Sequence, residues 1–299
     1  ANLIANGSIL FLLFNEIKEL RVNLHFQILK PYLIYAIPIF IMGLGGMLNE
    51  QLDKILIEHL LPADFYATMD STATLGVYGQ TFKLAIFMML AIQAFRYAGE
   101  PFFFSKADDK QAPELFAQIM HYFVIAALLL FVLVSINVDL IAHIFLRSPE
   151  YRVALYLVPI LLFGKLLYGI YLNLSIWFKI TDKTIYGTYF SLIGLVITII
   201  GNLILIPLMG MVGAALTMVF CYLIMSFLCY YFGQKNYPVP YNFFKIIPYC
   251  LISLVLVYLA FYFAHPSPII NTLLRIILSI ILVIILWAYE KRNLKAIKG

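Results

Sequence analysis

The chain has 299 residues, of which 64% are hydrophobic and 12% are charged, and its mean hydropathy is +0.96. Water-soluble domains carry roughly 25% charged residues, so this composition excludes a soluble globular protein. The formal charge of +5 is spread over short loops, which excludes a nucleic-acid-binding patch. We therefore predict an all-α, polytopic integral membrane bundle.

The N-terminal residues 1–14 are interpreted as the end of a membrane-spanning helix. Their apolar run, Ile4–Phe14, has no basic residue before it and no small-residue cleavage site after it, so it does not resemble a signal peptide. We expect the first helices of the protein to lie upstream of this chain. Residues 15–30 form a basic linker, which either connects two helical lobes or lies as a short amphipathic segment on the cytoplasmic leaflet.

Eight fuller apolar runs follow the linker, and each is long enough to cross a bilayer. They occupy approximately Pro31–Leu60, Leu75–Phe104, Leu115–Val138, Arg152–Lys179, Ile185–Ile206, Val212–Phe232, Phe244–Ala264 and Ile269–Tyr289. Lys and Arg are dense in alternate loops, with thirteen on one side against only Arg147 and Arg152 on the other. The positive-inside rule therefore predicts a cytoplasmic C-terminus and a multi-pass protein of the cell inner membrane.

The turn between the fifth and sixth of these runs has a distinctive sequence. It reads Asn202-Leu-Ile-Leu-Ile-Pro207-Leu-Met-Gly210-Met-Val-Gly213-Ala-Ala. We expect Pro207 to end one helix, Gly210 to make the turn, and Gly213 to let the next helix pack closely. The stretch resembles the corresponding turn in polysaccharide (Wzx-type) flippases of the MATE-like (MOP) superfamily.

Two further stretches carry the same resemblance, which covers essentially the whole chain. One begins at Leu75-Gly-Val-Tyr78 and includes Gln93-Ala-Phe-Arg96-Tyr-Ala-Gly-Glu100, and the other is Trp177-Phe-Lys179-Ile-Thr-Asp-Lys-Thr. The resemblance implies a parent with two six-helix lobes and a terminal helix pair. Residues 31–232 would be the second lobe and 233–299 the terminal hairpin with its basic tail. The missing N-terminal lobe would be a partner, since alternating access moves one lobe against the other.

Lys165 is the charge that lies farthest from either end of its apolar run. At about 1.5 Å of rise per residue, its ammonium lies about 18–20 Å from either end of its helix, too far for the side chain to snorkel. We predict that a carboxylate, a water-filled cavity or an anionic ligand compensates it. Tyr168 lies one turn further along the same face, where it either packs or stacks on a sugar.

Charged residues of the first two full runs are expected to meet at similar depths. In a hairpin centred near Thr68, Lys83 lies level with Asp53 and close to Glu50, so we predict that Lys83 pairs with one of these carboxylates. Such a pair either pins two helices or holds a cation ready for a phosphate. Asp53 and Glu50 are also the candidates for coupling an ion.

Two arginines, Arg96 and Arg275, lie inside apolar runs and near the ends of those runs. Arg96 either pairs with Glu100 on its own helix or receives a lipid pyrophosphate at the inner leaflet. Arg275 is expected to snorkel to the outer boundary.

The favoured function is a transporter that flips a lipid-linked oligosaccharide, carried on a polyprenyl pyrophosphate, for polysaccharide or O-antigen (lipopolysaccharide) export. The cations Lys83, Arg96 and Lys165 outnumber the well-buried acids, which favours an anionic cargo. No Gly-x4-Gly-Lys-Ser/Thr loop is present, so ATP hydrolysis by that route is not expected. The resemblance implies no enzyme activity and no cofactor. It implies membrane lipids and polysaccharide assembly proteins as further partners.

Three alternatives remain open from the sequence. An ion-coupled multidrug or metabolite antiporter would need a net acidic cavity. A membrane-integral polymerase, ligase or acyltransferase would need catalytic groups in an outer loop, and only the stretch Asp139–Arg152 offers any, without the spacing of a triad or a metal site. A scaffold without transport activity is the third. The five histidines and three cysteines show no metal-ligand spacing.

Overall fold

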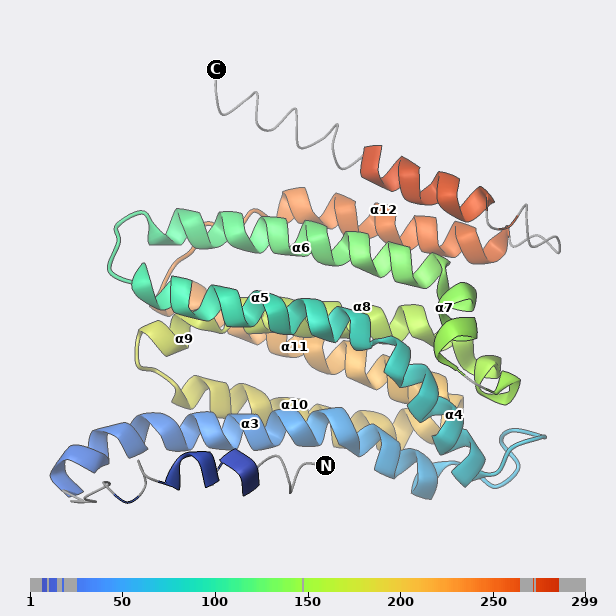
Figure 1. The fold of residues 1–299 in the computed structure, drawn as a ribbon, viewed down its shortest axis with the longest axis horizontal. Coiled ribbons are helices and arrows are strands. Elements are labelled where there is room, and N and C mark those ends of the chain that lie inside the picture. The colour runs from blue at the N-terminus through green and yellow to red at the C-terminus, as the bar shows by residue number, and fades with distance from the viewer. Residues whose placement is uncertain are drawn as a thin grey trace. The chain divides into compact units, whose positions relative to one another are not determined.

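The computed structural model describes residues 7–9, 11–14, 18, 26–146, 148–263, 271 and 273–284 (Figure 1). In these ranges the chain is helical apart from its connections and one isolated β-bridge between Tyr66 and Met69, which confirms the predicted all-α class. The chain divides into two compact units, residues 1–37 and residues 38–299. Helix α3 (Phe26–Leu60) begins in the first unit and continues in the second. Most of the predicted linker 15–30 lies outside the described residues, and its last five residues belong to α3.

Six helical segments in the described part of the chain are long and apolar enough to cross a membrane. They are Leu29–Leu60, Ala112–Ile136, Pro149–Ile180, Ile185–Met209, Met211–Asn236 and Phe243–Tyr262. A bent pair, α4 (Ser71–Leu84) and α5 (Ile86–Ser105), makes a seventh. These seven correspond to the first seven predicted runs. Of the eighth, the structure describes a shorter apolar helix, Leu273–Ile284, and its remaining residues lie outside the described ranges.

Helix α8 (Val158–Leu174) lies at the centre of the second unit. It packs against α4, α5, α6 (Ala112–Ile136) and α11 (Met211–Asn236), while α10 (Ile185–Met209) covers α11 and α12 (Phe243–Tyr262) covers α6 (Figure 1). Gly169 permits one of these contacts, because a Cβ there would lie 2.6 Å from Cζ of Phe123 on α6. The remaining elements are short: α7 (Val138–Phe145), the 3-10 helix η1 (Pro149–Leu157) and α9 (Ile176–Ile180).

Side-chain hydrogen bonds attach the second-unit part of α3 to α10. Thr188 Oγ1 donates to the carbonyl of Pro38 at 2.8 Å, and Ser191 Oγ donates to the carbonyl of Met42 at 3.0 Å. Lipid offers no hydrophobic force between helices, so hydrogen bonds of this kind and close packing hold them together. Figure 1 shows the second-unit part of α3 beside α10.

The second predicted run, Leu75–Phe104, is broken into two helices. The axis bends by 45° between α4 and α5, and Ala85 N–H bonds to the carbonyl of Phe82, three residues back, at 3.1 Å. Thr81 Oγ1, one turn earlier, bonds to the carbonyl of Val77 at 2.9 Å, a contact that often bends helices. The bend lets the end of α4 approach charged residues of α3, while α5 follows α8.

The turn between α10 and α11 follows the prediction in part. Gly210 has φ +57°, a left-handed conformation that favours glycine, and a Cβ at Gly213 would overlap the carbonyl of Leu205. Asn202 is fully buried and its amide donates to the carbonyl of Thr198 at 2.8 Å. The expectation for Pro207 was wrong: it lies inside α10, which continues to Met209. Pro207 lies in the last turn of α10, two residues before the helix ends.

Arg275 has an ionic partner that was not predicted from the sequence. Arg275, on the terminal helix, forms an ion pair with Asp139 on α7. The arginine side chain is 14% exposed and the aspartate side chain is 50% exposed. A carboxylate on a second helix therefore compensates the charge of Arg275, and its extension to the outer boundary stays a prediction.

Candidate functional site

A cleft of about 310 Å³ opens in the second unit, and the MATE-like resemblance had pointed to several of the residues in its wall. This volume lies at the lower end of small-molecule sites, which span about 300–1,000 Å³. Six helices supply its lining: Met42, Gly43, Gly46, Met47, Asn49 and Glu50 from α3; Met89, Gln93 and Arg96 from α5; Tyr168, Tyr171 and Leu172 from α8; Lys179 from α9; Ser191 from α10; and Tyr222 and Met225 from α11.

Several polar atoms in this wall are buried and lack a hydrogen-bond partner among the described residues. They are both amide atoms of Asn49, Oε1 of Gln93 and the hydroxyl of Tyr171. Asn49 is 5% exposed and Tyr171 is 3% exposed. A buried polar group without a partner costs about 1–3 kcal/mol, and natural proteins rarely leave several together. The cleft is therefore prepared for water or for a ligand rich in hydroxyl and oxygen groups.

Arg96 is the cation in this cleft that has no carboxylate partner in the described part of the chain. It is half-buried, and its guanidinium lies 5.6 Å from the ring centre of its neighbour Tyr97. The predicted alternative, pairing of Arg96 with Glu100, was wrong, because Glu100 Oε1 accepts from Lys179 Nζ at 2.6 Å. The four-residue spacing on α5 would allow Arg96 to pair with Glu100, but α9 places the ammonium of Lys179 on the Glu100 carboxylate instead.

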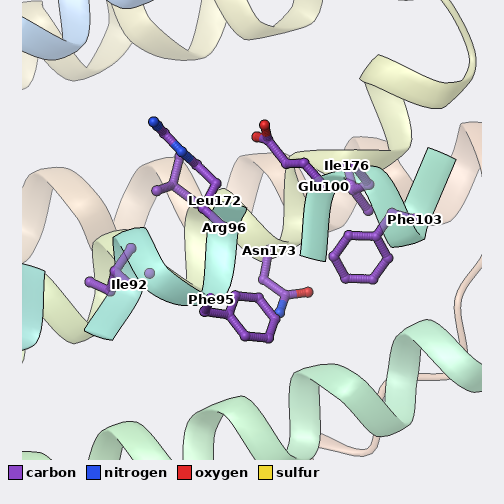
Figure 2. A pocket seen from close by; sticks show the side chains of 9 residues that line it. Ile92, Phe95, Arg96, Glu100, Phe103, Leu172, Asn173 and Ile176 are labelled. Atoms are coloured by element: carbon purple, nitrogen blue, oxygen red, sulfur yellow. The ribbon is translucent and has the colours of Figure 1, made fainter. Parts of the chain in front are cut away.

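A smaller pocket of about 20 Å³ lies next to the cleft and shares Arg96 and Leu172 with it. Figure 2 shows Arg96 and Glu100 pointing to the same side of α5, whereas Asn173 points toward the rings of Phe95 and Phe103. Asn173 is 3% exposed, and both of its amide atoms lack a partner within the described residues. A space of this size holds about one water molecule, which would satisfy the amide.

Lys165 is buried as predicted, with only 2% of its side chain exposed. A carboxylate compensates it: Lys165 Nζ forms an ion pair with Glu50 on α3, and it also lies 4.8 Å from the ring centre of Phe82. Lys165 is absent from the cleft lining, whereas Glu50 belongs to it. The prediction that Lys165 itself contacts cargo therefore lacks support from the geometry.

The predicted pair between Lys83 and Asp53 or Glu50 was wrong. Lys83 is exposed, and its ammonium donates to Gln80 on the same helix at 3.2 Å. Asp53 is 3% exposed and accepts hydrogen bonds from the hydroxyl of Tyr78 at 2.7 Å and the backbone N–H of Lys54 at 2.8 Å. The depth of Lys83 in the hairpin was estimated, but its helix face was not, and Tyr78 occupies the face toward α3.

Tyr168 lies in the cleft wall within a group of tyrosines. Its ring centre is 4.9 Å from that of Tyr222 and 6.5 Å from that of Tyr171. Three rings beside the unpaired polar atoms offer flat surfaces and hydroxyl groups together. This combination suits sugars, which present apolar ring faces and many hydroxyl groups.

The two amides of the site, Asn49 and Gln93, were not predicted as binding residues, and no role was predicted for Lys179. Asn49 and Gln93 could have been found as amides inside apolar runs, where polar residues often mark a pathway. Within the described residues, no group of three or more His, Cys, Asp or Glu side chains could hold a metal ion.

Comparisons with known proteins agree with this architecture. The family model described as MatE matches residues 65–204, a segment that contains the α5, α8 and α9 parts of the cleft wall. No curated protein sequence matches the chain. A solved structure titled lipid II flippase MurJ, inward closed conformation, superposes with a TM-score of 0.63 at 16% sequence identity. The match covers 93% of this chain and 59% of the MurJ chain, so this chain spans about three fifths of the length of that protein. The chain is therefore a multi-pass helical membrane protein that shares the fold of part of MurJ and contains a MatE-matching segment.

Proposed function

We propose that this chain forms the cargo-binding lobe of a flippase for a lipid-linked oligosaccharide on a polyprenyl pyrophosphate, in polysaccharide or O-antigen export across a bacterial inner membrane. One observation carries the proposal: among the described residues, Arg96 has no carboxylate partner, and the wall of its cleft also contains polar atoms of Asn49, Gln93 and Tyr171 without a hydrogen-bond partner. A guanidinium suits phosphate oxygens, and amide and hydroxyl groups suit sugar hydroxyls.

The comparisons supply the second line of support. The MatE match and the fold similarity to a protein titled as a lipid II flippase both favour a transporter with a lipid-linked substrate. Flipping by alternating access requires a second lobe, so we assign the transport step to this lobe acting with a partner lobe.

The charge of the cleft favours an anionic cargo over a cationic drug. Its ionised lining residues are Glu50, Arg96 and Lys179, so the cations exceed the acids. A multidrug cation antiporter would need the opposite balance, and so this alternative receives no support.

The test is binding of a defined lipid-linked sugar to the full chain in lipid nanodiscs. The probe is geranyl diphosphate-linked N-acetylglucosamine, titrated into wild-type, Arg96→Gln and Lys83→Gln proteins. Loss of the guanidinium should weaken binding by at least about tenfold, since charge-assisted hydrogen bonds are the strong ones. Lys83→Gln removes an equal charge from an exposed position outside the cleft and should bind like wild type. Absence of binding to wild type, or equal binding by the Arg96 variant, would refute the proposal.

The role in polysaccharide export has a separate cellular test. Cells that lose the intact transporter should accumulate polyprenyl-linked glycan on the cytoplasmic leaflet. Normal export without accumulation would remove this assignment while leaving the binding result in place.

A further inference from the structure

Lys179 is a second cation of the cleft, but a carboxylate already occupies it. Its ammonium lies 2.6 Å from Oε1 of Glu100, and the two side chains are 13% and 37% exposed. Lys179 belongs to the cleft lining, whereas Glu100 belongs to the small neighbouring pocket. Of the two cations that line the cleft, Arg96 has no carboxylate partner in the described ranges, whereas Lys179 is paired with the partly exposed Glu100.

The positions of these three groups suggest an exchange. Arg96 and Glu100 are four residues apart on α5 and point to the same side, as Figure 2 shows. Arg96 and Lys179 line the same cleft from α5 and α9. An anion bound at Arg96 thus lies on the same side of α5 as the Glu100–Lys179 pair.

We propose that Glu100 is a resident counter-ion that a diphosphate displaces from Lys179, so that the cleft selects a pair of phosphates over a single phosphate. The inference rests on the proposed function and specifies the head group that this site recognises. The first phosphate binds Arg96, and the second takes the place of the Glu100 carboxylate on Lys179.

The exchange conserves ion pairs. A diphosphate diester carries one negative charge on each phosphate, and Arg96 alone would leave one of these charges uncompensated in a partly dehydrated cleft, which is unfavourable. When the second phosphate binds Lys179, the ammonium keeps an anionic partner and Glu100 is released. Glu100 is the more exposed member of its pair with Lys179, so water can hydrate its carboxylate after release. A monophosphate diester has its single charge satisfied at Arg96 and gains nothing from displacing Glu100.

The test compares two probes that differ by one phosphate: geranyl diphosphate-linked and geranyl monophosphate-linked N-acetylglucosamine. Wild-type full chain in nanodiscs should bind the diphosphate more tightly, by up to about tenfold: the second phosphate gains one charge-assisted contact with Lys179, and release of Glu100 to water offsets part of this gain. Lys179→Gln should abolish this preference, and Lys179→Arg should retain it. Glu100→Gln should strengthen diphosphate binding by about tenfold and monophosphate binding by less than about twofold, because only the diphosphate competes with the carboxylate. Glu114→Gln, the same change at an exposed glutamate of α6 outside the cleft, should leave both affinities unchanged.

The outcomes separate the two proposals. If the Lys179→Gln variant keeps the diphosphate preference, or if Glu100→Gln strengthens both probes equally, the displacement is refuted and the cargo assignment stands. If the wild-type chain binds neither probe, the proposed function fails and the displacement fails with it. Size-exclusion chromatography of each variant shows whether it is folded, and Lys179→Arg provides a folded control that conserves charge.

Discussion

In the described part of the chain, two carboxylate–ammonium pairs connect helices, and they differ in how exposed their side chains are. Glu50 and Lys165 join α3 to α8 with side chains that are 28% and 2% exposed, while Glu100 and Lys179 join α5 to α9 with side chains that are 37% and 13% exposed. Breaking a buried pair leaves an uncompensated charge, whereas an accessible pair contributes little to stability. We conclude that the first pair fixes the position of α3, and that the second is free to change partners.

Removing the carboxylate of the less exposed pair, Glu50–Lys165, should produce the largest effect on stability. Glu50→Gln leaves the Lys165 ammonium without its anion, and the cost of such a change is about 3–5 kcal/mol. Chemical unfolding of the purified chain in detergent micelles, followed by the fluorescence of the buried Trp177, measures this loss of free energy.

A double variant distinguishes lost pairing from lost packing. Glu50→Gln combined with Lys165→Met removes both charges and should recover most of the stability, because an apolar replacement of a buried pair is often neutral. A double variant as unstable as Glu50→Gln alone would contradict the role assigned to the pair.

The hydrogen bond between Tyr78 and Asp53 is also buried, and its loss should have a smaller effect on stability. Tyr78→Phe removes the hydroxyl that donates to the buried carboxylate, although the backbone N–H of Lys54 still donates to it. Leaving an acceptor with one donor fewer should cost about 1–3 kcal/mol in the same unfolding experiment. Tyr97→Phe is the matched control, since Tyr97 is 72% exposed and should lose almost nothing. Equal effects of the two substitutions would contradict this assignment.

The Glu50–Lys165 pair also shows which features of the site could be predicted from the sequence. The depth of Lys165 followed from counting residues in an apolar run, because helical rise and bilayer thickness fix depth together. Its partner could not be predicted in the same way, since the facing helix depends on rotation and on tertiary packing. Lys83 illustrates the difference: one residue past Phe82 is about 100° of helix rotation, which is enough to turn the ammonium away from α3.

The membrane spans were more predictable than the cleft. Seven of the eight expected runs correspond to helices or a helix pair, because hydrophobic length is a direct requirement of the bilayer. The bend at Ala85 was not predicted, since its causes are local hydrogen bonds. Asn49 was not singled out either, because an uncharged polar side chain in an apolar run is common, and only the structure shows that its amide lacks a partner among the described residues.

Replacing an unpartnered polar group should raise stability, whereas breaking the Glu50–Lys165 pair should lower it. Asn49→Leu replaces an unsatisfied buried amide by an apolar side chain of similar size, so it should stabilise the chain by about 1 kcal/mol. The same change at Asn137, whose amide donates to the carbonyl of Leu133 at 2.8 Å, should destabilise it. The stabilised Asn49 variant should bind the glycolipid probe more weakly. A loss of stability in that variant would mean that the amide has a structural role.

Breaking the more exposed pair, Glu100–Lys179, should give the smallest change in stability. Glu100→Gln breaks the contact with Lys179, yet both side chains reach solvent, so the expected cost is below about 1 kcal/mol. Salt screens accessible charges, and the difference from wild type should shrink further between low and high ionic strength. Unfolding of Glu100→Gln and Glu50→Gln in parallel at both ionic strengths gives the comparison directly. If Glu100→Gln lost as much unfolding free energy as Glu50→Gln, and the loss did not depend on salt, the Glu100–Lys179 pair would be a structural pair that holds α5 to α9. In that case Glu100 could not leave Lys179 when cargo binds, because the exchange requires a pair that is easily broken.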